Sequence, residues 1–352
     1  MKASELSSTA ALLSQHETGQ INFSGIKLIE ADLSHLNLNR INLSGAYLSK
    51  ARLIGIKLVR ANLSNADLRQ ANFREAQLIE TSFSHANLSE AVLSKADLSG
   101  AILSGANLTG VELGFAHLIG TSLIGTQLRR AKLNGVNLTG ATLSRAILCE
   151  ADLRGATLNR AILSQADLKR ANLCGVSLVG AYLSGVDLRG ANLVGADLSE
   201  AELQGVNLSR ANLAGANLRG ADFSKAILCG AQMTGVDLQG ANLSQTNLEE
   251  LKLEKADLKG AKLSKANLHK ANLSQANLTG ANFLEANLSQ ANLSQAKLLG
   301  AGLLLAYLTR ANLRGANLSG ANLIGASLTG ADLKEACLQG AIMPNGMTYS
   351  QN

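Results

Sequence analysis

The sequence predicts an all-β fold, a closed β-helix with four sides, and three observations lead to it. From Ile21 to Asn345 the chain repeats every five residues without an insertion or deletion, which gives 65 blocks. The first residue of a block is Ala in 49 blocks, and the third is Leu in 58. Of the 34 glycines, 30 occupy the fifth position. A period kept over so long a stretch is typical of a solenoid.

The five-residue period excludes a single helix and a straight strand. Leu residues five apart would be rotated by about 140° around a helix, so they would not share a face. In a straight strand an odd period places successive Leu residues on opposite faces. Within a block, Ala and Leu are two residues apart and share a side, while pairs such as Ser-Gly and Thr-Gly at the fourth and fifth positions favour a turn. A turn after every block therefore keeps the Ala and Leu side chains inside a coil.

The bulky inward residues indicate the number of sides. Phe23, Phe83, Phe223 and Phe283 differ by multiples of 20 residues, and Phe73 falls on the opposite side. A coil of four blocks places each Phe column at one position around the axis. The 65 blocks then predict about 16 coils.

Each end of a β-helix exposes unpaired backbone groups that need cover. We expect residues 1–20 to form an N-terminal helical cap, with a short helix at Ser4–Gln15 and Leu6, Ala10 and Leu13 on one face.

The opposite end carries a turn signal. Pro344 and the following Asn-Gly pair predict that the β-helix of residues 21–345 stops there. We expect a frayed C-terminal tail over 346–352.

Composition limits the remaining choices. Aromatic residues make up only 3% of the chain, so the core is thin, and the net charge of +6 allows weak attraction to polyanions. The sequence contains no run of 18 apolar residues, so we expect no transmembrane helix. The N-terminal residues lack the apolar segment of a secretory signal, and we therefore expect a cytoplasmic protein. The four cysteines, which lack metal-ligand spacing, are Cys149, Cys174, Cys229 and Cys337.

Blocks such as ANLSN-ADLRQ-ANFRE-AQLIE from Ala61 and ANLRG-ANLSG-ANLIG-ASLTG from Ala311 resemble the pentapeptide repeat family. The resemblance covers residues 21–345 and implies a right-handed quadrilateral β-helix. The handedness follows from the resemblance alone. Members of the family differ widely in activity, so the resemblance says little about function. The uniform Asn-Leu-Ser blocks are closest in style to cyanobacterial members.

No arrangement of residues predicts catalysis. The histidines fall in different columns or distant coils without a nucleophile and carboxylate beside them. Asp and Glu mostly occupy the outward second position, where they alternate with Asn. We therefore expect a protein that is not an enzyme, with no catalytic residues, no cofactor and no metal.

Two stripes on the outer surface are candidate binding surfaces. Near the C-terminus, 20-residue spacing and neighbouring positions predict an outward apolar stripe at one corner, formed by Leu284, Leu299, Leu304, Leu305, Tyr307 and Ile324. Such a patch indicates a protein interface or a homodimer, although scattered surface leucines would look the same. A second stripe is a basic corner, formed by Arg129, Arg130, Lys169, Arg170, Arg189 and Arg210. It could bind an anionic partner weakly or simply be a solvated edge.

A third feature is the charged band Glu249–Lys262, in which Leu251 replaces the usual Ala. It fits either a solvated face or a local bulge that docks a partner.

These features favour a non-catalytic, rod-like protein that binds an unknown protein partner in a regulatory or scaffolding role. The alternative is weak binding to nucleic acid or another anionic surface through the basic corner, and a purely structural spacer is also open. The resemblance further implies relatives that protect DNA gyrase by mimicking DNA with an anionic surface. This chain is basic and has no protruding loops, so a gyrase-interacting role fits it less well.

Overall fold

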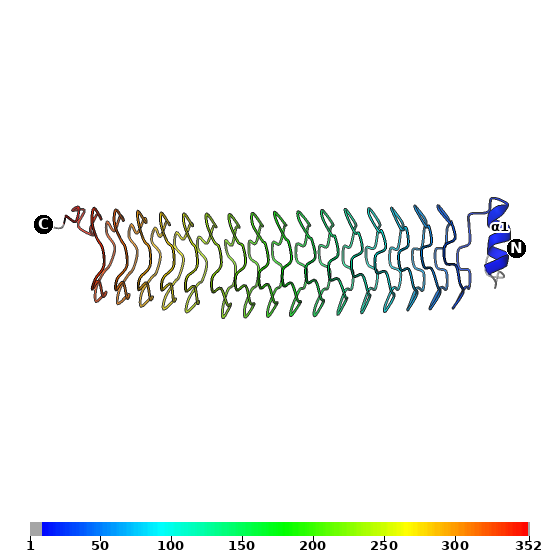
Figure 1. The fold of residues 1–352 in the computed structure, drawn as a ribbon, viewed down its shortest axis with the longest axis horizontal. Coiled ribbons are helices and arrows are strands. Elements are labelled where there is room, and N and C mark those ends of the chain that lie inside the picture. The colour runs from blue at the N-terminus through cyan, green and yellow to red at the C-terminus, as the bar shows by residue number, and fades with distance from the viewer. Residues whose placement is uncertain (1–8, 351–352) are drawn as a thin grey trace. The chain divides into compact units, whose positions relative to one another are not determined.

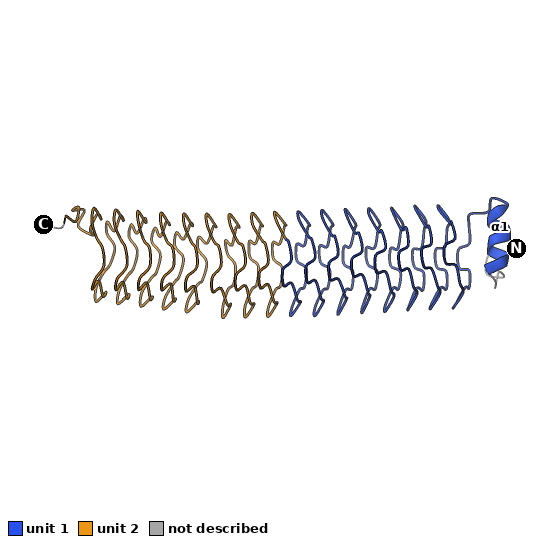
Figure 2. Ribbon diagram, viewed as in Figure 1, with its two compact units in different colours: residues 1–177 blue, residues 178–352 orange. Residues whose placement is uncertain are grey.

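The computed structural model describes residues 9–350, whose ribbon is dominated by regular coils (Figure 1). The single helix among these residues is α1, Thr9–Glu17. In place of long strands, the described chain forms short parallel β-bridges, one per block. The chain divides into two compact units, residues 1–177 and residues 178–352, which are described separately below (Figure 2).

The second residue of each block pairs with the residue 20 positions later. Asn22 pairs with Asn42, and Asn42 pairs in turn with Asn62, always in the parallel sense. The amide of Leu43 donates to the carbonyl of Asn62 at 2.7 Å, and the amide of Asn62 donates to the carbonyl of Ile41 at 2.9 Å. One coil therefore takes four blocks, which confirms the four-sided coil predicted from the Phe columns.

A tight turn follows each block. The amide of Ala46 donates to the carbonyl of Leu43 at 3.0 Å, and the intervening fifth residue, Gly45, has φ of +64°. An i to i+3 hydrogen bond with positive φ at i+2 is the pattern of a type II turn. In the described chain 34 non-glycine residues, all at this fifth position, also have φ between 55° and 61°. The coil register thus imposes the left-handed conformation, and glycine relieves its cost where it occurs.

The core consists of the first and third residues of the blocks. These Ala, Leu and Phe side chains are almost completely buried in both units. Phe73 and Phe83 meet edge to face, with ring centroids 6.0 Å apart and planes at 89°. A few blocks place Thr inside, and the Thr81 hydroxyl donates to the carbonyl of Leu58 at 2.6 Å. Because this hydroxyl has a partner, its burial carries little penalty.

The outward second residue explains why Asn and Asp alternate in the sequence. The Oδ1 atom of Asn42 accepts from the amide of Ser44 at 3.1 Å, and the Oδ1 atom of Asp32 accepts from the amide of Ser34 at 3.0 Å. Either side chain can therefore brace the turn that follows it. Asn can also donate, and the Nδ2 atom of Asn42 reaches Oδ1 of Asn22 at 2.9 Å.

The N-terminal helix differs in detail from the prediction. Helix α1, Thr9–Glu17, extends two residues beyond the predicted end at Gln15 and lies beside the first coil (Figure 1). Leu12 is completely buried, whereas Ala10 is exposed and Leu13 is half-buried, so the buried face is not the one expected. The predicted contribution of Leu6 lies outside the described residues.

The C-terminal residues are paired rather than frayed up to Tyr349. Ile342 and Thr348 form an antiparallel bridge, and the amide of Tyr349 donates to the carbonyl of Ala341 at 2.7 Å. The turn that begins at Pro344 reverses the chain, so the following residues fold back on the last coil.

Candidate interaction surfaces

The apolar stripe of unit 2 is built by three successive coils. Leu284, Leu304 and Ile324 occupy the fourth position of their blocks. Their carbonyls accept hydrogen bonds from the preceding coil at 2.8, 3.0 and 2.9 Å. Leu284 and Leu304 are half-buried, while Ile324 is 38% exposed. The three side chains therefore follow one another in the predicted column.

Leu305 and Tyr307 broaden this surface. Leu305 is 47% exposed, and its Cδ2 atom lies over Gly325 of the next coil, 2.7 Å from where a β-carbon would stand. Tyr307 is 55% exposed and pairs with Asn287 and Ser327 on the adjoining side.

Leu299 does not flank this corner. Its carbonyl accepts from the amide of Gly280, which places it at the turn one block before Leu304. The expectation that it shares a corner with Leu305 is wrong, because five residues along the chain advance a side chain to the next corner.

The structure adds Pro344 to the column. The carbonyl of Pro344 accepts from the amide of Gly325 at 3.0 Å, one coil beyond Ile324. Pro344 also lines a shallow hollow of about 540 Å³ together with Met343, Met347 and Tyr349. Pro344 follows Leu304 and Ile324 at the same 20-residue spacing, so the sequence already contains the signal for its place in the column.

The basic corner falls partly in each unit. In unit 1, Arg129 and Arg130 lie two coils before Lys169 and Arg170, and the intervening coil contributes Glu150. The Nε atom of Arg130 lies 2.8 Å from Oε2 of Glu150. This hydrogen bond lowers the pKa of Glu150. One carboxylate thus offsets part of the positive charge at this corner.

The other partners further reduce the free charge. The Nζ atom of Lys169 lies 3.0 Å from Oδ2 of Asp167. In unit 2, the Arg189 guanidinium contacts Asp187 at 2.7 Å, and the stem of Arg210 packs over Gly230. Four of the six predicted cations therefore lie at one corner of unit 1 in two pairs separated by one coil, and at least three of the six are paired with acids.

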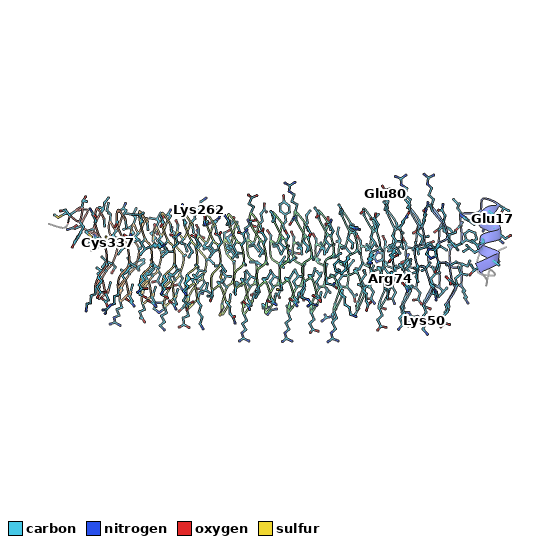
Figure 3. All side chains as sticks on the ribbon, in the orientation of Figure 1. Glu17, Lys50, Arg74, Glu80, Lys262 and Cys337 are labelled. Atoms are coloured by element: carbon cyan, nitrogen blue, oxygen red, sulfur yellow. The ribbon has the colours of Figure 1, made fainter. Side chains whose placement is uncertain are left out.

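Charged side chains elsewhere also point outward from the coils, as Lys50, Arg74 and Glu80 do (Figure 3). Among residues 9–350 no group of three or more His, Cys, Asp or Glu residues could hold a metal ion. No helix within the same residues has the length and apolarity needed to cross a membrane.

With this geometry in view, comparison with known proteins identifies the class. A family model described as pentapeptide repeats (8 copies) matches residues 21–110, 112–301 and 306–343 in overlapping stretches. The chain therefore belongs to the pentapeptide repeat family. Members of this family fold as right-handed quadrilateral β-helices, as the sequence resemblance implied.

Solved structures include similar proteins. HetL, a pentapeptide repeat protein involved in heterocyst differentiation regulation in the cyanobacterium Nostoc sp. strain PCC 7120, is 29% identical, with 98% of this chain and 100% of HetL covered and a TM-score of 0.24. Rfr23 from the cyanobacterium Cyanothece 51142 is 37% identical over 34% of this chain and 91% of its own, with a TM-score of 0.27.

A trypsin-treated form of QnrB1, a plasmid-mediated fluoroquinolone resistance protein, is 21% identical over 65% of this chain and 88% of its own, with a TM-score of 0.25. Among the curated proteins, none matches this chain.

Proposed function

We propose that the protein is a non-catalytic interaction protein that binds another protein through the apolar stripe of unit 2. The observation that carries the proposal is the continuous column Leu284, Leu304, Ile324 and Pro344, with Leu305 and Tyr307 beside it. Apolar side chains that follow one another in a column on an outer surface are typical of protein interfaces.

The chemistry of the stripe indicates the kind of partner. It combines branched aliphatic side chains with one exposed tyrosine, and the hollow at Met343 and Met347 extends it. Such a surface would bind an apolar patch or an amphipathic segment of a protein, in a contact that resists salt. A regulatory or scaffolding role would fit this arrangement, and HetL is described as involved in the regulation of heterocyst differentiation.

The partner could also be a second copy of the chain. Among residues 9–350 the amides of Leu328, Leu333 and Leu338 in the last coil find no hydrogen-bond acceptor, and all three side chains are half-exposed. Open edges of this kind favour self-association. At the other end, we propose that α1 caps the first of about 16 coils, since Leu12 is fully buried.

Leu304→Glu is the test. We expect this variant to lose the proteins that wild-type protein retains from an extract of its native cell at high salt, and to sediment as a monomer if wild-type protein is a dimer. Ser294→Glu, at the fourth position of another side, is the matched control. Retention of the same partners and the same mass by Leu304→Glu would rule the stripe out.

A second candidate function is weak binding of a polyanion through the basic corner. It rests on Arg129, Arg130, Lys169 and Arg170 in unit 1, where the basic residues outnumber the acidic ones. This binding would be lost at high salt, which distinguishes it from the apolar stripe.

A further inference from the structure

One junction between coils in unit 2 differs from its neighbours. The coil of residues 221–240 and the coil of 241–260 lack the usual inter-coil hydrogen bonds on two adjacent sides. At regular boundaries the corresponding amides donate to a backbone carbonyl of the adjacent coil. Here six amides do not, namely those of Lys225, Leu228, Gly230, Met233, Asn247 and Lys252. The amide of Gly235 still reaches the carbonyl of Glu254, but at 3.4 Å.

The equivalent bonds are short on both sides of this junction. One coil earlier, the amides of Leu208, Arg210 and Leu213 donate across the coil boundary at 2.8, 2.9 and 2.8 Å. One coil later, the amides of Leu248, Glu250 and Leu253 do so at 2.7, 2.9 and 2.8 Å. The loss is therefore confined to one boundary.

The two coils remain in register. Ile227 still faces Asn247, and Gln232 still faces Lys252, as parallel bridges. Beneath them Ala226 and Ala231 are each 4% exposed, whereas Ala266 and Ala271, at the same places two coils later, are 1% and 0% exposed. The boundary is thus widened on these two sides without being separated.

The inward residues give a physical cause. On the two widened sides Thr246 and Leu251 stand where Ala is usual. Thr alone does not widen a boundary, because Thr121 keeps the neighbouring bond from Ser122 to Ala101 at 3.0 Å. Leu251 is the exception in its column, since every other first residue at this place in unit 2, from Ala191 to Ala331, is Ala. A larger side chain in a close-packed core displaces its neighbours.

Met233 packs on the same side in place of the usual Leu and is fully buried. Its flexible side chain adapts to irregular space. On the same side the carbonyl of Glu254 accepts only the long bond from Gly235, and the Glu254 side chain turns to the following coil, where its Oε1 atom accepts from Asn272. Each of these features weakens the junction relative to a regular one.

We propose that this junction is a built-in joint, at which unit 2 opens before any of its other interior coil boundaries, with Leu251 as the wedge. Opening here separates residues 178–240 from residues 241–352 on two sides only. The other two sides stay hydrogen-bonded, because the amide of Phe223 donates to the carbonyl of Asn242 at 2.8 Å and the amide of Leu238 donates to the carbonyl of Asp257 at 2.6 Å. The joint would let the apolar stripe, which lies on the C-terminal side, tilt as it meets a partner. It does not depend on that stripe being functional.

Amide hydrogen exchange of the intact protein tests the joint. We expect the amides of Leu228, Gly230, Met233, Asn247 and Lys252 to exchange at least about tenfold faster than Leu208, Leu213, Leu268 and Leu273, their counterparts at regular boundaries. Equal protection at the two sets of amides would overturn the proposal.

Two substitutions test the wedge. Leu251→Ala restores the usual inward residue, so these amides should become about as protected as those of neighbouring coils. Ala291→Leu, in the same column, should create a new fast-exchanging boundary two coils away. If Leu251→Ala folds and the fast exchange persists, Leu251 is not the cause. Exchange in wild-type protein decides the joint itself even if a variant fails to fold.

Discussion

The ring of Phe115 lies directly over Gly135 of the next coil, with its Cε1 atom 2.6 Å from the point where a β-carbon on Gly135 would stand. Both residues occupy the fifth position and have positive φ, 59° for Phe115 and 64° for Gly135. His35 covers Gly55 and His85 covers Gly105 in the same way. At each of these fifth positions, a large side chain is therefore accommodated by a glycine one coil later.

Gly135→Ala should lower the free energy of unfolding by more than the backbone conformation alone requires. A non-glycine residue in the left-handed region costs about 1 kcal/mol, and the new methyl group would also displace the Phe115 ring. Gly140→Ala is the matched control, because Gly140 has φ of +65° and nothing within 4 Å of its β-carbon position.

A double-mutant cycle measures the contribution of the ring. It compares the denaturant unfolding of wild-type protein, Phe115→Ala, Gly135→Ala and the double variant Phe115→Ala/Gly135→Ala. Removal of the ring should recover the excess loss. Equal effects of Gly135→Ala and Gly140→Ala would show that the ring moves aside freely.

The repeat made most of the fold predictable, and particular residues show where prediction stopped. Because the register never slips, arithmetic in steps of 20 placed Leu284 above Leu304 and Ile324. The same arithmetic places Leu299 one corner before Leu304, because the two residues are five apart and one side of the coil takes five residues. The widened boundary at Leu251 could not be predicted, since the sequence marks the unusual residue but not whether the backbone yields to it.

The Asn ladder of unit 2 gives a second prediction. The Nδ2 atom of Asn292 donates to Oδ1 of Asn272 at 3.2 Å, and its own Oδ1 atom accepts from Asn312 at 3.2 Å and from the amide of Ser294 at 3.1 Å. Asn292→Ala removes all three and should lower the free energy of unfolding by about 1–2 kcal/mol.

Asn292→Asp keeps the acceptor that braces the turn and should cost less than Asn292→Ala. Lys297→Ala, at the next second position along the chain, is the control and should be nearly neutral. Thermal or denaturant unfolding followed by circular dichroism checks the order. A Lys297→Ala variant as unstable as Asn292→Ala would contradict the role of the ladder.

Glu80 should titrate below its ordinary pKa. A hydrogen bond from Arg60, whose Nε atom lies 2.6 Å from Oε2 of Glu80, lowers the pKa of this carboxyl from 4.5, and the charge of Arg60 acts in the same direction. A carboxyl with a lower pKa in the folded state stabilises it above the unfolded pKa. That contribution is lost as the pH falls through the folded pKa.

Nuclear magnetic resonance titration of the Glu80 carboxyl carbon measures this shift. Arg60→Gln should return the pKa of Glu80 toward 4.5. Arg40→Gln, one coil before Arg60 at the same corner, should leave it unchanged, because among the described residues the ion-pair partner of Glu80 is Arg60 and not Arg40. A Glu80 pKa that does not respond to Arg60→Gln would mean that the ion pair is absent in solution.

The basic corner of unit 1 is limited by its own carboxylate, so removing that carboxylate should strengthen it. Glu150 binds Arg130 directly, and the charges of Arg170 and Arg129 act on it as well. Glu150→Gln frees Arg130 and raises the local positive charge by one. We expect tighter binding of a single-stranded oligonucleotide at low salt, and little difference at high salt, where counterion release contributes less.

The same charge change at another corner separates local from overall effects. Glu80→Gln adds one positive charge to the same unit but away from Arg129 and Arg170, so it should increase affinity less than Glu150→Gln. Arg170→Glu should reduce affinity below that of wild-type protein. Fluorescence anisotropy over a range of salt concentrations measures all three. If Glu150→Gln and Glu80→Gln raise the affinity equally, the oligonucleotide responds to net charge, and the corner is a solvated edge rather than a binding surface.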